Sequence, residues 1–317
     1  MSSAMDRVSQ MAIIGTGLLG ASVGLGLKAA GFRGRIVGVG RRPESVQEAI
    51  ARGAIDEAAP DVPQAVAQSQ LALVAVPLSQ FDAVFKQIAQ GDHEDLVITD
   101  VGSTKQEVLE AARRRLAQPQ RFVGSHPMAG SEQQGPGAAR ADLCRNKPCI
   151  LTPEPDTHAW ALERVEALWT MLGMRLIRMP AQEHDRQTAV ISHLPHAVSV
   201  LLVQVAAERG GWQIASTGFA DTTRLASSNP PMRADILWAN REEVAASLEA
   251  FRRRLDRFCD LLSRGDQEAL LAMLQQTKQR RDQWLKRQGR FLEVSACEAP
   301  QPQNKPENNA TASEHLA

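Results

Sequence analysis

The stretch MAIIGTGLLG at residues 11–20 decides the fold of this chain. A short apolar run leads directly into three glycines, and an Ala/Leu/Val-rich helix is expected from about Leu18 to Ala30. In this spacing Gly15 allows a tight turn, Gly17 lets the backbone approach a pyrophosphate, and Gly20 lets the helix pack close to the strand. A diphosphate would then lie on the free amides at the positive end of the helix. The stretch predicts a dinucleotide site, and its alternative is an ordinary glycine-rich turn.

Apolar runs typical of strands alternate with helical patterns over the first 180 residues. They are Met11–Ile14, Arg35–Val39, Leu71–Val76, Leu96–Thr99, Phe122–Gly124, Pro148–Leu151 and Met174–Arg178. This alternation predicts βαβ units and a parallel sheet. After residue 180 the patterns are helical, over 181–209, 231–239, 242–263 and 266–287. We therefore expect an α/β, Rossmann-type doubly wound domain over residues 1–180, an all-helical domain over 181–294, and a disordered polar tail over 295–317.

The composition excludes several classes of function. Lys plus Arg and Asp plus Glu both total 36, which gives no charge bias toward nucleic acid or anionic membrane. The four cysteines lack CxxC spacing and neighbouring histidine pairs, so we expect reduced thiols and no metal site. The first ten residues are polar, and we count no run near the ~20 apolar residues of a membrane span. These features predict a soluble cytoplasmic protein.

The segment 181–209 is apolar around most of its circumference, as expected of a helix buried in a core or against a second subunit. Thr188, Ser192, His196 and Ser199 interrupt it at helical spacing and form one polar stripe, and Pro195 should kink it. Buried polar groups need partners. A ligand would satisfy them, and so would hydrogen bonds to the preceding turn or to the neighbouring domain.

Two further motifs follow predicted strands. DVGSTK at residues 100–105 carries Ser103, and GSHPMAGSE at residues 124–132 carries His126. Ligands of doubly wound sheets bind outside the carboxyl ends of the strands, which puts both residues on the cofactor's side. A histidine there can accept a proton from a hydroxyl that loses hydride. The alternative for His126 is a capping or core histidine.

A third motif, DTTRLASSNP at residues 221–230, lies in a helix-breaking connection. Its Arg224 can pair with a carboxylate through two hydrogen bonds, and the alternative is a surface arginine.

Together with SHLPH at residues 192–196, these motifs resemble the prephenate/arogenate dehydrogenase family of tyrosine biosynthesis. The resemblance covers nearly all of residues 11–287, in family order. It implies oxidative decarboxylation: hydride passes from the ring C4 of prephenate or arogenate to nicotinamide, and the ring carboxylate leaves as CO2. The products would be 4-hydroxyphenylpyruvate or tyrosine. It also implies a helical domain that forms a homodimer.

The resemblance implies roles for single residues. His126 takes the proton of the ring hydroxyl, with Ser103 assisting near the nicotinamide. The implied substrate contacts are Ser192, His196, Arg224, its orienting partner Asp221, and Glu132 at the pocket mouth. His193 is interpreted as structural because it follows Ser192 and faces elsewhere. Arg233 stands where many members have tryptophan.

The end of the second predicted strand bears on the cofactor. Gly40, Arg41 and Arg42 stand where NAD-preferring members carry an acidic residue. Glycine cannot bind a ribose 2′-hydroxyl, whereas two arginines can bind a 2′-phosphate, so we favour NADP over NAD. The alternative is a solvated turn with NAD still used. The predicted cofactor contacts are Gly15, Gly17, Leu18, Leu19, Gly20, Gly40, Arg41, Arg42, Val76, Pro77 and Ser103.

Other functions remain open at this stage. A β-hydroxyacid dehydrogenase or imine reductase of similar plan typically places a catalytic lysine on its helical domain, where this chain has Ser192 and His196. A non-catalytic NADP-sensing protein would bind cofactor without turnover. Prephenate and arogenate, which differ by a keto group and an ammonium, are not distinguished by the sequence.

Overall fold

The computed structural model describes residues 4–131 and 133–297. The chain forms two compact units, Met1–Asp256 and Arg257–Ala317. The first unit holds the whole sheet. The glycine turn and the other motifs of the sequence also lie in it, because the last of them ends at residue 230.

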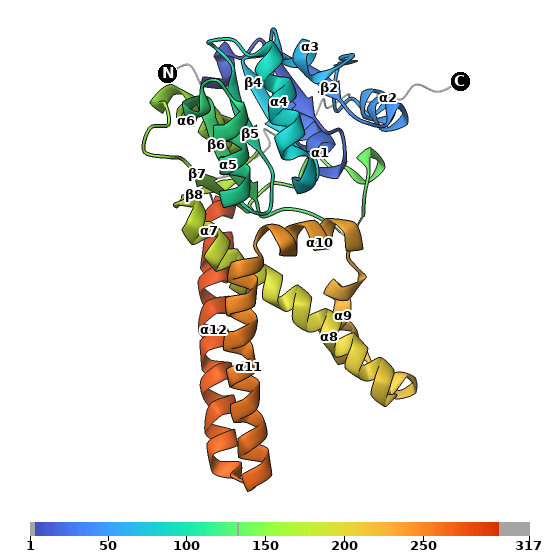
Figure 1. The fold of residues 1–317 in the computed structure, drawn as a ribbon, viewed down its shortest axis with the longest axis vertical. Helices are drawn as coiled ribbons and strands as arrows, with labels where there is room; N and C mark the ends of the chain where they lie inside the picture. The colour runs from blue at the N-terminus through green and yellow to red at the C-terminus, as the bar shows by residue number, and fades with distance from the viewer. Residues whose placement is uncertain (1–3, 132, 298–317) are drawn as a thin grey trace, which may run out of the picture. The chain divides into compact units, whose positions relative to one another are not determined.

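An eight-stranded sheet organises the first unit (Figure 1). In chain order its strands are β1 (Gln10–Ile14), β2 (Arg35–Val39), β3 (Glu57–Ala58), β4 (Leu71–Val74), β5 (Val97–Asp100), β6 (Phe122–Pro127), β7 (Pro148–Thr152) and β8 (Arg175–Arg178). Their order in space is β3-β2-β1-β4-β5-β6-β7-β8. The order reverses between β1 and β4, and the crevice at such a point is where doubly wound folds bind ligands.

The sheet differs from the expected one in two respects. The sequence patterns did not predict β3, which is too short to show periodicity. The expectation of a wholly parallel sheet was wrong, because β7 runs antiparallel to β6, with His126 opposite Ile150. A parallel return needs a long crossover. The described part of the connection between these strands contains a 3-10 turn at Pro136–Ala138 and no α-helix.

Helices cover both faces of the sheet (Figure 1). The helices α1 (Leu18–Ala29), α2 (Pro43–Ala51) and α6 (Ala159–Met171) pack on one face, and α3 (Val62–Val66), α4 (Phe81–Gly91) and α5 (Gln106–Arg115) pack on the other. Alternate residues of β1 enter the two cores: Met11 and Ile13 belong to the first, Ala12 and Ile14 to the second. Strands covered on both faces are apolar throughout, which explains why they were visible in the sequence.

After β8 the first unit is helical. Its elements are α7 (Ala181–Thr188), a π-helical turn (Ala189–His193), α8 (Leu194–Arg209), α9 (Thr217–Thr223), a 3-10 turn (Arg224–Ser227), α10 (Pro230–Ala239) and α11 (Arg241–Arg264), which continues into the second unit. Pro195 lies in the first turn of α8, where its missing N–H costs least. The π-helical turn lies just before α8, and the kink expected at Pro195 stays a prediction.

The continuous helix Ala181–Arg209 is long and apolar enough to cross a membrane by length and composition alone. This finding corrects the expectation that no run approaches the apolar length of a membrane span. Only 22% of its most apolar window is buried. Large apolar side chains are exposed along it, among them Val190, Ile191, Leu201 and Val205.

The second unit contains the end of α11 and the helix α12 (Gln267–Cys297). Gly265 separates the two helices with a φ of 66°, and Asp266 caps α12 by accepting a hydrogen bond from the amide of Ala269 at 3.0 Å. The helix continues to Cys297, beyond residue 294 where the helical domain was expected to end. The rest of the predicted tail lies outside the described residues.

Candidate active site

The glycine turn after β1 has no room for side chains at two of its three glycines. Gly15 has a φ of 103°, and a Cβ there would lie 2.3 Å from the carbonyl oxygen of Ala75. A Cβ on Gly20 would lie 2.0 Å from the carbonyl oxygen of Gly15. The turn therefore depends on glycine at both positions.

Gly17 is different, because a Cβ there would meet no atom within 4 Å. It is the N-cap of α1, whose first turn, with the half-buried Leu18 and Leu19, carries no acidic residue. The free amides and positive dipole end of α1 thus face open space. This arrangement fits the diphosphate of a dinucleotide.

The turn between β2 and α2 is crowded by two side chains at its first position, Gly40. A Cβ on Gly40 would lie 2.8 Å from Cγ2 of Val46 and 3.0 Å from Oγ1 of Thr16. Arg41 and Arg42 are exposed, and neither forms an ion pair within the described parts of the chain. At the end of β4, Val76 is half-buried and Pro77 is exposed.

His126 is the next to last residue of β6 and is nearly buried, at 9% exposure. Its Nδ1 lies 2.8 Å from Nε2 of His184 on α7. Burial, together with the neighbouring His184 and the Lys105 ammonium, holds the pKa of His126 well below 6.5. The imidazole is therefore neutral near pH 7 and able to accept a proton.

His184 connects His126 to a carboxylate. Its Nδ1 lies 2.7 Å from Oδ1 of Asp185, and both residues are buried. Asp185 also accepts hydrogen bonds from the backbone amides of Lys105 at 2.8 Å and Gln106 at 2.9 Å. The sequence reading missed both residues. Continuing the polar stripe four residues back from Thr188 would have reached His184.

Ser103 is half-buried in the short loop between β5 and α5. Beside it, Lys105 and Asp100 form a completely buried ion pair, and the Lys105 ammonium also donates to the carbonyl of Ser125 at 2.7 Å. Asp100 accepts from the amides of Gly102 and Ser125 at 2.7 and 2.9 Å. This network fixes the loop that carries Ser103 next to the strand that carries His126.

The polar stripe of the helical region is satisfied mostly by the protein. Thr188 donates to the carbonyl of His184 in the preceding turn at 2.9 Å. Ser199 accepts from the amide of Ala226 at 3.1 Å, and the Nδ1 of His196 lies 3.3 Å from the carbonyl of Leu225. Internal hydrogen bonds therefore satisfy Thr188, Ser199 and one ring nitrogen of His196.

The remaining SHLPH side chains lie differently. Ser192 is half-buried, and His193 is buried with its Nδ1 3.1 Å from Nδ2 of Asn240, which itself donates to the carbonyl of Asp185 at 2.8 Å. Burial lowers the pKa of both His193 and His196 to about 4.

Two arginines bring positive charge to these histidines. Arg233 is half-buried, its Nε is buried without a hydrogen-bond partner in the described structure, and its charge contributes to the low pKa of His193 and His196. Arg224 acts more weakly on His196 and is exposed. Asp221 is exposed too, and within the described residues no ion pair joins it to Arg224. Glu132 lies outside the described residues.

Helix α10 links this region to the cofactor side, because Ser79, just after Pro77, donates to Oδ2 of Asp235 at 2.6 Å. The structure thus brings Ser103 and His126 together with the buried residues of α7. It leaves Arg224 and Asp221 on the surface. In the described part of the chain, no group of three His, Cys, Asp or Glu side chains is arranged to hold a metal ion.

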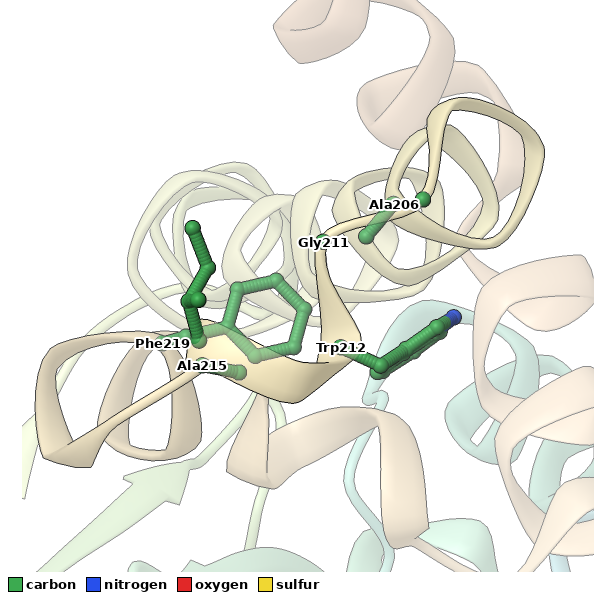
Figure 2. A pocket seen from close by; sticks show the side chains of 7 residues that line it. Ala206, Gly211, Trp212, Ala215 and Phe219 are labelled. Carbon is green, nitrogen blue, oxygen red and sulfur yellow. The ribbon is translucent and has the colours of Figure 1, made fainter.

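An apolar pocket lies where α8 ends (Figure 2). Trp212 and Phe219 meet edge to face in it, with ring centroids 5.7 Å apart. Its lining is Ala206, Gly210, Gly211, Trp212, Ile214, Ala215 and Phe219. None of these side chains titrates, so the pocket cannot move a proton and is separate from the chemistry of His126.

Comparison with known proteins agrees with this geometry. Residues 23–178 match the family model of the prephenate dehydrogenase nucleotide-binding domain, and residues 180–276 match that of the prephenate dehydrogenase dimerization domain. The prephenate dehydrogenase of Bacillus subtilis is 34% identical over 276 residues, which span 85% of this chain and 74% of the relative.

Solved structures are similar as well. A prephenate dehydrogenase from A. aeolicus, in complex with hydroxyphenyl propionate and NAD+, superposes with a TM-score of 0.82 at 31% identity, covering 87% of this chain and 98% of the other. An arogenate dehydrogenase from Synechocystis gives a TM-score of 0.76 at 29% identity, covering 87% and 99%. Both predicted parts, Rossmann-type and helical, are thereby confirmed.

Proposed function

Because the chain belongs to the prephenate dehydrogenase family, we propose that His126 accepts the ring-hydroxyl proton while prephenate or arogenate is oxidised and decarboxylated. The observation that carries this proposal is the neutral, buried imidazole at the carboxyl end of the sheet. A general base must be unprotonated at working pH and within reach of the proton it takes.

The step balances with a nicotinamide as the hydride acceptor. Hydride leaves the ring C4 as the hydroxyl proton passes to Nε2 of His126 and a carbonyl forms. The ring carboxylate then departs as CO2, its electron pair completes the aromatic ring, and the proton returns to the oxygen. Ser103, on the loop fixed by the Lys105–Asp100 ion pair, would assist this proton transfer at the same edge of the sheet.

We assign the substrate side chain to the region of Ser192, His196 and Arg224, with Asp221 and Glu132 as further contacts. The support is electrostatic: Arg224 and Arg233 bring positive charge to His196, and a guanidinium suits a carboxylate. The buried Nε of Arg233 has no partner within the described structure, which makes this arginine a second carboxylate contact.

For the cofactor we favour NADP over NAD. Gly40 offers no acceptor for a ribose hydroxyl, a side chain there would press on Val46 and Thr16, and the exposed Arg41 and Arg42 carry the charge that a 2′-phosphate needs. The glycine turn, Leu18, Leu19, Val76, Pro77 and Ser103 would form the rest of this site.

We also propose a soluble, cytoplasmic homodimer. Residues 180–276 match a dimerization domain, and exposed apolar side chains along Ala181–Arg209, with the pocket of Figure 2, supply an apolar surface for a second copy. Sedimentation equilibrium should give twice the mass of the chain.

Steady-state kinetics with prephenate and arogenate, each with NADP+ and NAD+, test the function directly. We expect CO2 release with 4-hydroxyphenylpyruvate or tyrosine as product. Arg224→Ala should raise the substrate KM at least tenfold, about 1.4 kcal/mol, and leave cofactor binding unchanged, while Arg224→Lys should recover part of the loss. Turnover of simple 3-hydroxy acids with neither ring substrate accepted would overturn the assignment.

A further inference from the structure

Behind His126, two buried side chains of α7 continue a line of hydrogen bonds into the protein. His126 Nδ1 and His184 Nε2 are 2.8 Å apart, and His184 Nδ1 and Asp185 Oδ1 are 2.7 Å apart. Their exposures are 0% for His184 and 1% for Asp185. No described residue hydrogen-bonds the Nε2 of His126, so the hydrogen-bonded chain from Asp185 through His184 ends at this nitrogen.

The partners of Asp185 determine where the protons lie. Its oxygens face the backbone N–H groups of Lys105 and Gln106, both of them donors. An ionised carboxylate only accepts, so the third contact, His184 Nδ1, carries a hydrogen. A neutral imidazole has one N–H, which leaves His184 Nε2 as an acceptor. His126 Nδ1 must then be the donor between the two rings, and His126 Nε2 keeps a free lone pair.

The opposite arrangement would place two lone pairs against each other. If His184 donated from Nε2, its bare Nδ1 would face a carboxylate oxygen at 2.7 Å inside a buried site. Unpaired buried acceptors are costly. The other ionisable groups nearby are already engaged: Lys105 with Asp100, and His193 with Asn240.

We propose that His184, held by Asp185, is a positioning residue that fixes His126 in the tautomer able to accept the substrate's proton at Nε2. When that proton arrives, the charge on His126 is stabilised through His184 by the Asp185 carboxylate. This inference rests on the proposed role of His126. It goes beyond that role because it assigns a function to two residues that do not contact substrate.

Three variants test the proposal by kinetics. His184→Leu removes the acceptor, and we expect kcat to fall about 10²-fold with unchanged cofactor affinity. His184→Gln places an amide oxygen near the position of the lost Nε2 and should recover about tenfold over the leucine variant. His93→Leu is the matched control: this half-buried histidine bonds only backbone carbonyls, of Val66 at 3.2 Å and Ser69 at 3.1 Å, and its loss should leave kcat unchanged.

Nitrogen NMR of histidine-labelled wild-type protein tests the tautomer without turnover. The chain has seven histidines, so single substitutions assign the signals. We expect His126 protonated at Nδ1 in wild type and a mixture of tautomers in His184→Leu. This result stands or falls independently of whether prephenate is the substrate, and it decides the proposal even where the leucine variant does not fold.

Two results would overturn the proposal. One is a wild-type His126 protonated at Nε2. The other is an equal loss of kcat in His184→Leu and His184→Gln, since a purely structural role gives the amide oxygen no advantage.

Discussion

At the scale of single residues, burial sets the chemistry of His126. His126→Asn should lower kcat by about 10²–10⁴-fold and leave cofactor affinity nearly intact, because it removes the proton acceptor and not the glycine turn. His93→Asn is the control and should retain wild-type kcat. A His126→Asn enzyme with most of its wild-type rate would remove this residue from the mechanism.

The same residue predicts the pH profile. Only the neutral imidazole accepts a proton, so kcat/KM should rise with pH through the pKa of His126 and then level off. Burial holds that pKa well below 6.5, so the enzyme should keep its activity at pH 6.5 and lose it only in more acidic buffer. A half-maximal point at or above pH 6.5 in the kcat/KM profile would contradict the buried environment described for His126.

Residues differ in how far the sequence alone could identify them. Ser103 and His126 follow strands that are visible as apolar runs, so their place at one edge of the sheet was predictable. His184 and Asp185 lie in the middle of the short, polar helix α7, and although the polar stripe extends back to His184, no local pattern indicates that Asp185 is buried with it. Their importance follows from the packing of α7 against α5, which only the structure shows.

At the scale of elements, the π-helical turn explains why helical spacing was an incomplete guide. Five residues, Ala189–His193, form it, and the extra residue rotates everything that follows relative to a regular helix. His193, which was interpreted as structural, is buried with its Nδ1 next to Asn240. Periodicity predicted the helix, and the irregular turn near Pro195 decided which side chains point inward.

The turn between β2 and α2 carries the cofactor prediction. Replacing Arg41 and Arg42 together by alanine should lower the preference for NADP+ over NAD+ more than tenfold, because charge-assisted contacts to a phosphate contribute about 1.5–3 kcal/mol. The ratio of kcat/KM for the two cofactors measures it. Arg33→Ala, an exposed arginine before β2, is the control. An unchanged ratio would mean that Arg41 and Arg42 lie outside the site.

At the scale of the whole molecule, four buried histidines couple stability to pH. Burial lowers the pKa of His126, His184, His193 and His196. Below pH 6.5 the unfolded chain binds protons that the folded chain does not, so stability rises with pH in this range and is lost as pH falls. Each histidine contributes at most about 1.4 kcal/mol per pH unit.

Urea unfolding at pH 7 and pH 5 measures this coupling. The urea concentration at the unfolding midpoint should be lower at pH 5 than at pH 7. His196→Gln should reduce this difference because the variant has one fewer imidazole that is neutral in the folded protein and protonated in the unfolded chain. His93→Gln should not reduce it. Equal midpoints at the two pH values would contradict the lowered pKa of the four buried imidazoles.

The crowding at Gly40 has an evolutionary consequence. A side chain at position 40 would press on the Val46 methyl group, which would have to shift, so the effect of an acidic substitution there depends on the residue at position 46. A smaller residue at position 46 would make room for it. The two positions are therefore coupled, and we expect an acidic residue at position 40 to occur together with a small residue at position 46 in related sequences.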